Sequence, residues 1–576
     1  MKRPQTLQLH NHWWCEWTFW VLIALVISAY FINLDRLPFI GEETRRALIA
    51  REMVQYDDWI VPRQQGVPRL TKPPLQYWAI ALTTNLFDVE SRFTVRLTSV
   101  LAILLTSIIV YGYARLFLSS NGALAAGLSF ATIVDVLHSG RFAQIDALFT
   151  CLLSASLLLW HWGYLRQWPC WINWIVAYAF AALATLTKGP QAPVYFMTTV
   201  WIYLIYRKDW RCLFSVGHAL GVGAFFALLA GWLVPFSTRI GWQAFLALFA
   251  SEATTRSNVF QSHFLRHLLR FPFEFFLSAF PATLIFPFYC HRNFWRQLEH
   301  RRDAALFSLL CIVIAFPTCW LAPGGEARYL MPIYPCLAIL VGITVEVLAL
   351  HCTQWPWLKW MNTNLYRMAC GLSCLMGVGL LILTLMGLGE AVGLTSKQEN
   401  LFNAGGFLLL GWLAWRSAQS ATFIPVHFQF CFFLALAYNG IMIPRLEHLC
   451  RDMGQEVTQS SLDEITAYEL VSLNWVHHRF VYFYPQPIRV LNWPQEWPAV
   501  GGYFCFDAEG IPPELPFNWQ PIKQIPVDRF KKKGQAKEQV ILAKRLPDRI
   551  SMLEDKHPLE KQPSRKLEVI TQSDIK

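Results

Sequence analysis

Apolar segments close to the length of a membrane-spanning helix recur along the first 443 residues, and this pattern constrains the fold most. A bilayer core of roughly 30 Å needs about 20 apolar residues per helix. Thirteen such segments can be placed, at 17–34, 93–114, 122–137, 146–163, 171–187, 191–206, 213–236, 272–290, 304–322, 329–350, 366–388, 403–415 and 423–443. Charged residues make up only 15% of the chain and hydrophobic residues 55%, which excludes both an ordinary soluble enzyme and a disordered chain. The sequence predicts a polytopic α-helical membrane protein.

Basic residues between these segments predict the orientation of the chain, because cytoplasmic loops are rich in Lys and Arg. With Lys2 and Arg3 inside, the alternate loops contain Arg115, Arg166, Arg207, Lys208, Arg211, Arg292, Arg296, Arg301, Arg302, Lys359, Arg367 and Arg416. An odd number of spans then places the region after residue 443 outside the cytoplasm. The segment 75–87 is too short to span and predicts an interfacial or re-entrant helix.

The composition changes after residue 443, and residues 444–546 predict a small soluble α/β domain outside the cytoplasm. Strands are expected at 479–484, 502–506 and 539–543, and a helix at 461–473. The polar residues 547–576 predict a disordered tail. Cys450 and Cys505 could form a disulfide in an oxidising compartment, or remain free thiols.

The first outer segment, residues 35–72, is unusually rich in charges of both signs. It holds seven basic and six acidic residues: Arg36, Arg45, Arg46, Arg51, Arg63, Arg69, Lys72, Asp35, Glu42, Glu43, Glu52, Asp57 and Asp58. Such a loop on the outer side predicts binding of an anionic group. Glu42 and Glu43 stand at the start of an amphipathic helix predicted to lie at the membrane surface, where the helix dipole favours acids. A capped interfacial helix without chemistry is the alternative.

Three further charged residues fall at the same predicted outer face as Lys72. Lys72 precedes two prolines that restrict its backbone, which suits phosphate binding, although a lysine at an aromatic belt is the alternative. Asp146 begins an apolar helix, where a carboxylate needs a partner or a function, and Arg141 is the candidate for a purely structural ion pair. Lys188 closes one predicted span and Arg328 opens another. Their convergence from distant segments predicts a site.

Several segments also resemble a known enzyme family. The run EETRRALIAREM, followed by DWIVPR, GVP and KPPLQYW, and later IDALF, LTKGP and RYLMPIYP, strongly resembles the polyprenyl-phosphate-dependent glycosyltransferases of the GT-C class. The protein O-mannosyltransferase and aminoarabinose–lipid A transferase group is the most similar, over roughly residues 17–350. The family has an outward-facing cavity and a catalytic acid in the first outer loop. Its usual Asp-Glu is Glu42-Glu43 here, and Arg46 replaces an aromatic residue.

The resemblance implies a membrane glycosyltransferase that moves a sugar from a polyprenyl phosphate, such as undecaprenyl phosphate, to an acceptor hydroxyl or phosphate on lipid A, protein or glycan, with inversion. Glu42 is the expected general base, Glu43 its rival, and Asp146 would orient the acceptor or share that role. The expected phosphate-binding residues are Arg45, Lys72, Lys188 and Arg328. A divalent cation could bridge carboxylates and phosphate, although no motif requires one.

The expected location is the bacterial inner membrane, in contact with membrane lipids, and nucleic acid is not an expected partner. Two alternative functions remain open at this point. A flippase or transporter of lipid-linked sugars also needs a cavity and basic residues, but it needs no proton acceptor. A non-catalytic relative would bind lipid phosphate without turnover.

Overall fold

A computed structural model of the chain describes residues 13–69, 72–243, 264–322, 324–351, 356–389, 393–394, 396–417, 423–452, 469–507, 515–528 and 538–547. The chain divides into two compact units, residues 1–460 and 461–576. The predicted boundary at 443/444 and the predicted tail therefore stay predictions, and the tail lies almost wholly outside the described residues.

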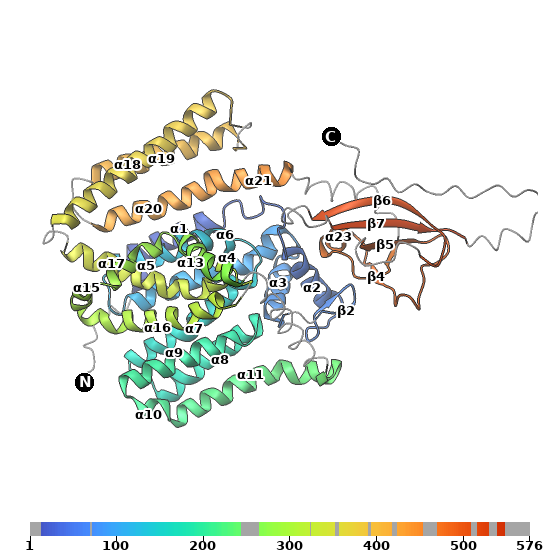
Figure 1. Ribbon diagram of the computed structural model, residues 1–576, viewed down its shortest axis with the longest axis horizontal. Helices are drawn as coiled ribbons and strands as arrows, with labels where there is room; N and C mark the ends of the chain where they lie inside the picture. The colour runs from blue at the N-terminus through green and yellow to red at the C-terminus, as the bar shows by residue number, and fades with distance from the viewer. Residues whose placement is uncertain are drawn as a thin grey trace, which may run out of the picture. The chain divides into compact units, whose positions relative to one another are not determined.

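The first unit is helical (Figure 1). Its first half contains η1 (Trp13–Cys15), α1 (Trp17–Tyr30), α2 (Glu43–Gln55), α3 (Leu75–Phe87), α4 (Arg92–Ala114), α5 (Ser120–Thr132), α6 (Val134–Ser139), α7 (Ile145–Leu165), α8 (Cys170–Lys188), α9 (Gln191–Arg207), α10 (Trp210–Leu213) and α11 (Val216–Ile240). Its second half contains α13 (Phe264–Ser278), η2 (Ala282–Ile285), α14 (Phe286–Tyr289), α15 (Arg292–Gln297), η3 (Glu299–Arg301), α16 (Arg302–Trp320), η4 (Ala327–Ile333), α17 (Tyr334–His351), α18 (Pro356–Leu385), α19 (Lys397–Ser417), α20 (Phe423–Ala437), η7 (Tyr438–Met442) and α21 (Ile443–Asp452).

Eight helical stretches among the described residues are long and apolar enough to cross a membrane, or nine if the bent pair α13 and η2–α14 counts as one span. The predicted multi-pass helical membrane fold is thereby confirmed, while the thirteen spans stay a prediction. The difference arises where apolar runs form shorter helices. The run 122–137, for example, gives α5 of 13 residues and then α6, with the break at Ile133.

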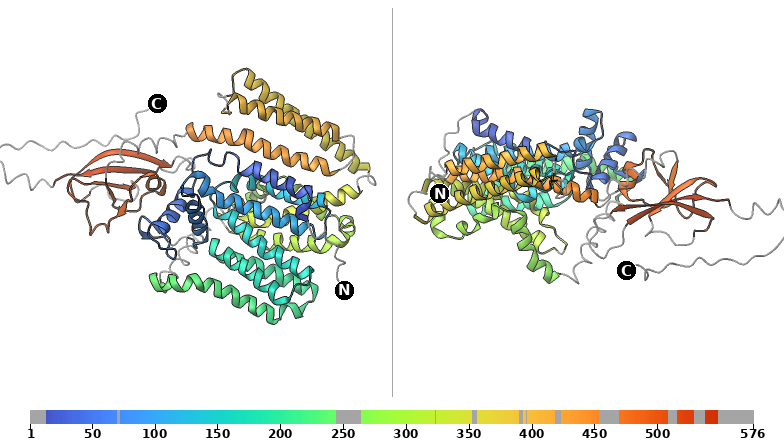
Figure 2. Two further views of the ribbon diagram at one scale, coloured as in Figure 1. Left: turned by 180° about the vertical axis from the view of Figure 1, so that it is seen from behind. Right: turned by 90° about the horizontal axis from the view of Figure 1, so that it is seen from above.

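The bundle is built around α4, α5, α7 and α17, whose apolar side chains form one large buried core. The long helices lie side by side, and α2 and α3 lie at one end of the bundle (Figures 1 and 2). This end contains the charged segment 35–72. The fold of this segment therefore determines which charged side chains lie at this end of the bundle.

The segment between α2 and α3 folds onto these two helices. Helix α3 has the bounds predicted from the sequence, and one of its faces is buried while Leu82 and Leu86 are exposed. Helix α2 differs from the amphipathic surface helix that was predicted, because its buried residues lie on most of its circumference and include charged ones. A hairpin of β1 (Arg63–Gln64) and β2 (Val67–Pro68) lies between the helices. Its turn, at Gln65 and Gly66, donates two backbone hydrogen bonds to the Glu52 carboxylate, at 2.6 and 3.0 Å.

The second unit contains a five-stranded sheet with the order β4–β3–β5–β7–β6. Its strands are β3 (Leu470–Ser472), β4 (Arg489–Val490), β5 (Tyr503–Asp507), β6 (Trp519–Asp528) and β7 (Glu538–Arg545), and the helix α23 (His478–Phe483) joins β3 to β4. Strand β3 pairs in parallel with β4 and β5, whereas β7 pairs in an antiparallel way with β5 and β6. Phe504, Phe506 and Phe517 lie in its core.

The small unit both confirms and corrects the predicted elements. The strands predicted at 502–506 and 539–543 are confirmed as β5 and β7. The strand predicted at 479–484 is wrong, because α23 covers this run. Most of the helix predicted at 461–473 lies outside the described residues, and its last residues form β3 instead. Cys505 is a buried free thiol, so the disulfide with Cys450 that the sequence left open does not form.

Candidate active site

The two adjacent glutamates at the start of α2 have opposite surroundings. Glu43 is completely buried and forms a two-pronged ion pair with Arg96 of α4, with both N–O distances at 2.8 Å. Its carboxylate also accepts hydrogen bonds from the backbone N–H groups of Ile40 and Ala143, each at 2.8 Å. Glu43 therefore joins three segments of the chain, and a carboxylate held in this way is poorly suited to act as a base.

Arg96 is the residue that shapes the loop before α2, and the sequence analysis did not identify it. Besides Glu43, its guanidinium donates to the carbonyl oxygens of Leu34, Leu37 and Pro38 at 2.8 to 2.9 Å. A fully buried arginine is retained only where its donors are satisfied. The one signal in the sequence was a charged residue inside the apolar run 93–114.

Glu42, by contrast, occupies the N-cap position of α2 without a capping hydrogen bond from its side chain, which is 45% exposed and forms an ion pair with Arg45 one turn later. Arg69 is also close: burial lowers the pKa of Arg69, and the positive charge of Arg45 lowers it further, while Glu42 opposes this. Among the residues that the structure describes, the Nε atom of Arg45 is buried without a hydrogen-bond partner. This corner therefore has an accessible carboxylate and an excess of positive charge.

Lys72 is half-buried in the turn that leads into α3. It follows Leu70 and Thr71, which lie outside the described residues. Its position in the chain is thus between Arg69 and the first turn of α3.

Asp146 and Lys188 form the second group of predicted residues. The carboxylate of Asp146, in the first turn of α7, lies 2.5 Å from Lys188 Nζ at the end of α8. The Asp146 side chain is buried, and 10% of the Lys188 side chain is exposed. The Lys188 ammonium lies 4.7 Å from the ring centre of Tyr329, beside Arg328. Arg328 itself pairs with Glu326 at 2.5 Å.

The alternative in which Asp146 forms a purely structural ion pair with Arg141 is wrong. Arg141 instead donates to the carbonyl oxygen of Ile32 at 2.7 Å and to Asn439 at 2.9 Å. It is therefore used to fasten the end of α1 to η7, and Asp146 takes Lys188 as its partner.

Arg46 connects the two groups. It is buried and donates to the carbonyl oxygen of Ala143 at 3.0 Å and to the Gln144 side chain at 2.8 Å. Burial lowers its pKa, while the charges of Glu42 and Asp146 are among those that oppose the shift. The residue that departs from the family's aromatic position thus links α2 to the start of α7. Glu42, Glu43, Arg45, Asp146, Lys188 and Arg328 all belong to this one end of the bundle.

A cavity of about 540 Å³ opens beside these residues. It is lined by Ile40, Gly41, Asp135, His138, Ser139, Phe142, Gln144, Glu274, Leu277, Ser278, Glu326, Ala327 and Arg328. Gly41 precedes Glu42, and Gln144 lies two residues before Asp146, so the cavity borders both groups. The sequence analysis missed Asp135, although it is a carboxylate within a predicted apolar span, the same signal that singled out Asp146.

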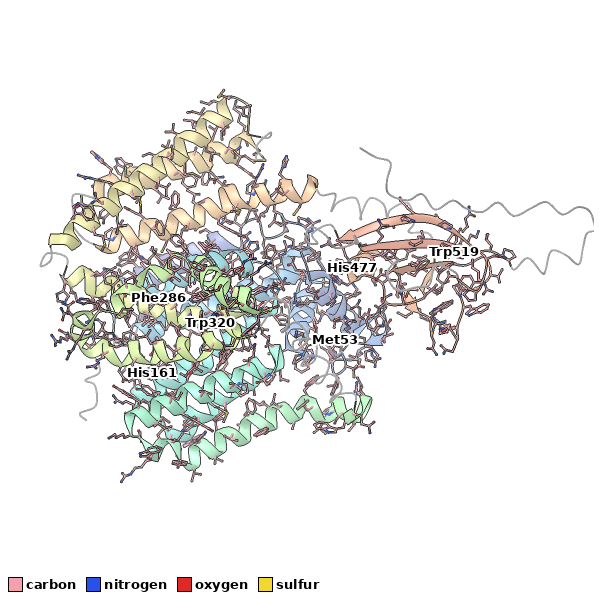
Figure 3. All side chains as sticks on the ribbon, in the orientation of Figure 1. Met53, His161, Phe286, Trp320, His477 and Trp519 are labelled. Atoms are coloured by element: carbon pink, nitrogen blue, oxygen red, sulfur yellow. The ribbon has the colours of Figure 1, made fainter. Side chains whose placement is uncertain are left out.

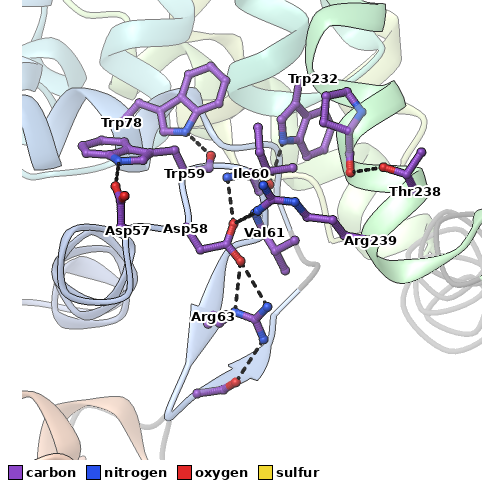
Figure 4. A network of polar contacts seen from close by, with 12 residues as sticks. Asp57, Asp58, Trp59, Ile60, Val61, Arg63, Trp78, Trp232, Thr238 and Arg239 are labelled. Carbon is purple, nitrogen blue, oxygen red and sulfur yellow. Dashed lines mark hydrogen bonds and ion pairs between the residues drawn. The ribbon is translucent and has the colours of Figure 1, made fainter.

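The DWIVPR motif fixes the loop between α2 and α3 to α11 (Figure 4). The Asp58 carboxylate accepts from the N–H groups of Ile60 and Val61 at 3.2 Å each, and pairs with Arg63 at 3.1 Å and with Arg239 at 2.6 Å.

Two tryptophans hold the same loop from the other side. The indole N–H of Trp78 donates to the Trp59 carbonyl oxygen at 2.7 Å, and that of Trp232 donates to the Ile60 carbonyl oxygen at 2.9 Å. The motif therefore holds the hairpin in place and does not itself enter the cavity.

The residue set gives no support to a resident metal ion. Within the part of the chain that the structure describes, no group of three or more His, Cys, Asp or Glu side chains is arranged to hold one.

Comparison with known proteins agrees with this architecture. Residues 71–240 match the profile of the dolichyl-phosphate-mannose-protein mannosyltransferase family. An uncharacterized protein of Aquifex aeolicus is 25% identical over 476 residues, which cover 81% of this chain and 86% of that protein. The undecaprenyl phosphate-alpha-4-amino-4-deoxy-L-arabinose arabinosyl transferase of Pseudomonas aeruginosa is 28% identical over 321 residues, or 53% of this chain and 55% of that enzyme. The match thus spans about half the length of that transferase.

The fold has a counterpart of known structure over nearly its whole length. The crystal structure of ArnT from Cupriavidus metallidurans bound to undecaprenyl phosphate aligns with a TM-score of 0.64 and 17% identity, covering 92% of this chain and 98% of that one. The resemblance predicted from the sequence is confirmed. Together these comparisons support a GT-C glycosyltransferase of the ArnT and protein mannosyltransferase type.

Proposed function

We propose that this protein transfers a sugar from a polyprenyl-phosphate donor, of the undecaprenyl phosphate kind, to an acceptor at the outer face of a bacterial inner membrane. The observation that carries the proposal is the convergence of Glu42, Arg45, Lys188 and Arg328 at one end of a membrane bundle, beside a cavity of about 540 Å³. A lipid phosphate needs cations near the membrane, and the sugar and acceptor need space next to them.

The reaction is a displacement at the anomeric carbon of the donor sugar. The acceptor oxygen forms a bond to this carbon while the bond to the phosphate oxygen breaks, and the electron pair leaves with the lipid phosphate. The acceptor proton passes to a carboxylate, for which the half-exposed Glu42 is the candidate. Such proton transfer contributes about 10²- to 10⁴-fold to a rate. Direct attack of this kind inverts the anomeric centre.

Positive charge is proposed to hold the donor phosphate and to stabilise it as it leaves. Arg45 and Lys72 stand on the α2–α3 side of the site, and Lys188 and Arg328 on the other side. Cations fixed in a partly dry site interact with a phosphate more strongly than they do in water. The buried Nε atom of Arg45, which lacks a partner among the described residues, supports this role.

Glu43 and Asp146 are proposed to position these groups. Glu43 fixes the loop and the start of α2 through Arg96, and Asp146 fixes Lys188. Neither is accessible enough to take a proton from a substrate, since both side chains are buried. The proposal therefore assigns the base role to Glu42 instead of Glu43 or Asp146.

The test is a transfer assay with the purified protein, using undecaprenyl-phosphate-linked hexose, pentose and aminopentose donors. Membranes from a strain that lacks the gene supply the unmodified acceptor. Wild type should label the membranes from at least one donor, and Glu42→Gln should lose at least about a hundredfold of that rate while it still binds undecaprenyl phosphate. Transport of the donor without any transfer, unchanged by Glu42→Gln, would instead show a flippase.

A further inference from the structure

Asp135 differs from the other acids around the cavity in the partners that hold it. Glu274 pairs with Arg270, and Glu326 pairs with Arg328, each at 2.5 Å. Asp135 takes part in no ion pair among the described residues. Two neutral hydroxyl groups donate to it instead, Ser139 Oγ to Oδ1 at 2.8 Å and Tyr334 OH to Oδ2 at 3.2 Å. Each carboxylate oxygen can accept a further hydrogen bond.

Because Asp135 lines the cavity, its carboxylate can accept these further hydrogen bonds from a group that is bound there. Asp135 lies on the short helix α6, beyond the end of α5, and it lines the cavity with Gly41, Gln144 and Arg328. These three residues are next to, or part of, the groups proposed to act on the donor. A group that occupies the cavity therefore meets Asp135 on one side and the reacting centre on the other.

The charge of the lining restricts what can bind there. Three carboxylates of the lining, Asp135, Glu274 and Glu326, outnumber its one arginine, Arg328, and Asp135 has no cation paired with it among the described residues. An acceptor that brings its own negative charge would be repelled, whereas hydroxyl groups could donate to Asp135. The basic corner at Arg45 and Arg69 has the opposite character, so the two sides of the site select for different chemistry.

We propose that this cavity is the acceptor subsite, that Asp135 positions the acceptor by accepting a hydrogen bond from one of its hydroxyl groups, and that the acceptor is attacked at a hydroxyl and not at a phosphate. This inference rests on the proposed function. It makes Asp135 a positioning residue that selects the acceptor class, while Glu42 receives the proton.

A pH effect follows, because burial raises the pKa of Asp135 to about 6, an increase that the hydrogen bonds from Ser139 and Tyr334 limit. Above this pH Asp135 is a carboxylate that only accepts hydrogen bonds, and below it the group carries a proton and accepts less well. The acceptor should therefore bind less tightly as the pH falls through about 6. The titratable and charged groups that face Asp135 are Tyr30, His138, Asp146, Glu274, Glu326, Arg328 and Tyr334.

The first experiment measures sugar transfer against the concentration of acceptor membranes from the strain that lacks the gene. Asp135→Asn should raise the apparent KM for the membranes about tenfold, the loss expected for one hydrogen bond to a charged group, with kcat changed less than KM. Undecaprenyl phosphate binding should match wild type, which also shows that the variant folds. Glu496→Gln, an ion-paired acid of the second unit, is the matched control and should keep the wild-type KM.

Two measurements on wild type do not depend on any variant. Its apparent KM for the membranes should rise below about pH 6, and this rise should be absent in Asp135→Asn. Labelled product, separated from the donor, should keep its sugar in mild acid, because an ordinary glycoside survives treatment that cleaves a glycosyl phosphate.

Three outcomes would overturn the inference. They are an unchanged KM in Asp135→Asn, a wild-type KM that stays constant across pH 6, and release of the sugar from the product by mild acid. In each case wild type still transfers sugar, so the proposed function stands. If wild type transfers sugar from none of the donors, the proposed function fails and this inference fails with it.

Discussion

The two ends of the helical unit both contain buried charged clusters, yet only one of them has the features of a site. Helix α7 joins them: Asp146 lies in its first turn and His161 near its last, 15 residues or about 22 Å further along. His161 is labelled in Figure 3, on the bundle away from Met53 of α2. The same helix thus carries a polar cluster at each end.

The cluster around His161 is closed by its own partners. Asp303 accepts from Tyr203 OH at 2.7 Å and pairs with Arg207 at 3.2 Å. Nearby, Glu346 pairs with Arg301 at 2.7 Å and accepts from Ser119. Neither acid lines the cavity of about 540 Å³. These residues tie α5, α7, α9, α16 and α17 together and leave no accessible carboxylate.

The comparison teaches that a buried ion pair does not by itself indicate catalysis. Glu43–Arg96 resembles Asp303–Arg207 in that both fix the helices around them. The site end differs through the half-exposed Glu42, the surplus of cations around Arg45 and the adjoining cavity. We therefore assign the chemistry to the residues of this end whose charged groups have the fewest hydrogen-bond and ion-pair partners.

The largest difference expected between the two ends is in the transfer rates of the variants Glu42→Gln and Asp303→Asn. Glu42→Gln should lower the transfer rate about 10²- to 10⁴-fold because it removes the proton acceptor. Asp303→Asn should leave the rate per folded molecule close to wild type. Transfer assays normalised to folded protein make this comparison, and equal losses in the two variants would remove the distinction between the ends.

Substitution of a paired acid at either end should lower the stability of the protein to a similar degree. Asp146→Asn and Asp303→Asn each leave a largely buried cation without its counter-charge, which destabilises a protein by up to roughly 3 kcal/mol. Thermal unfolding in detergent should show both losses. Only Asp146→Asn should also weaken transfer per folded molecule, about tenfold, because Lys188 loses its position; an unaffected transfer rate would show that Asp146 is purely structural.

Donor binding should depend on the cations at one end only. Arg45→Gln should weaken binding of undecaprenyl phosphate about tenfold, the loss expected for one charge-assisted hydrogen bond. Arg207→Gln, the matched arginine at the other end, should bind as wild type does. Native mass spectrometry with the lipid measures both, and an equal loss in Arg207→Gln would point to a general effect on folding.

The smallest effect is expected where Asp58 fastens the loop to α11. Burial alone would raise its pKa, but hydrogen bonds from Val61 and Arg63 bring the pKa below the usual value. A lowered folded-state pKa stabilises above the pKa of the unfolded chain, about 4, and the gain is lost as the pH falls through the folded value. Asp58→Asn should therefore cost at most about 1 kcal/mol at pH 7 and less near pH 3, as measured by unfolding at the two pH values. A loss that does not change with pH would contradict this account.

Local patterns in the sequence were sufficient for part of the fold. Apolar length predicted the helical membrane unit, and alternation of side chains predicted β5 and β7. The run 479–484 misled because its residues favour strands. Strands β3 and β4 are parallel, however, so a crossover must join them, and α23 fills this connection with His477 capping its first turn. That requirement cannot be seen within the run itself.

The sequence predicted which charged residues belong to the candidate site, but it did not predict which of them form ion pairs with one another. Asp146, Lys188 and Arg328 could be named because charges are costly at the ends of apolar helices, and Glu42 because it lies in an outer segment rich in charges. Which partner each one takes depends on the packing of helices far apart in the sequence, as for Glu43 and Arg96, 53 residues apart. Asp135 carried the same signal as Asp146, a carboxylate within a predicted apolar span, but only the folded chain shows that it lies beside the cavity.

The most direct test of the central claim is a structure of the protein determined with bound undecaprenyl phosphate. The account predicts phosphate density at the α2–α3 end of the bundle, within contact distance of Arg45 and Lys72 and beside the cavity that Arg328 lines. Phosphate density at the opposite end, near Arg207 and Arg301, would contradict it.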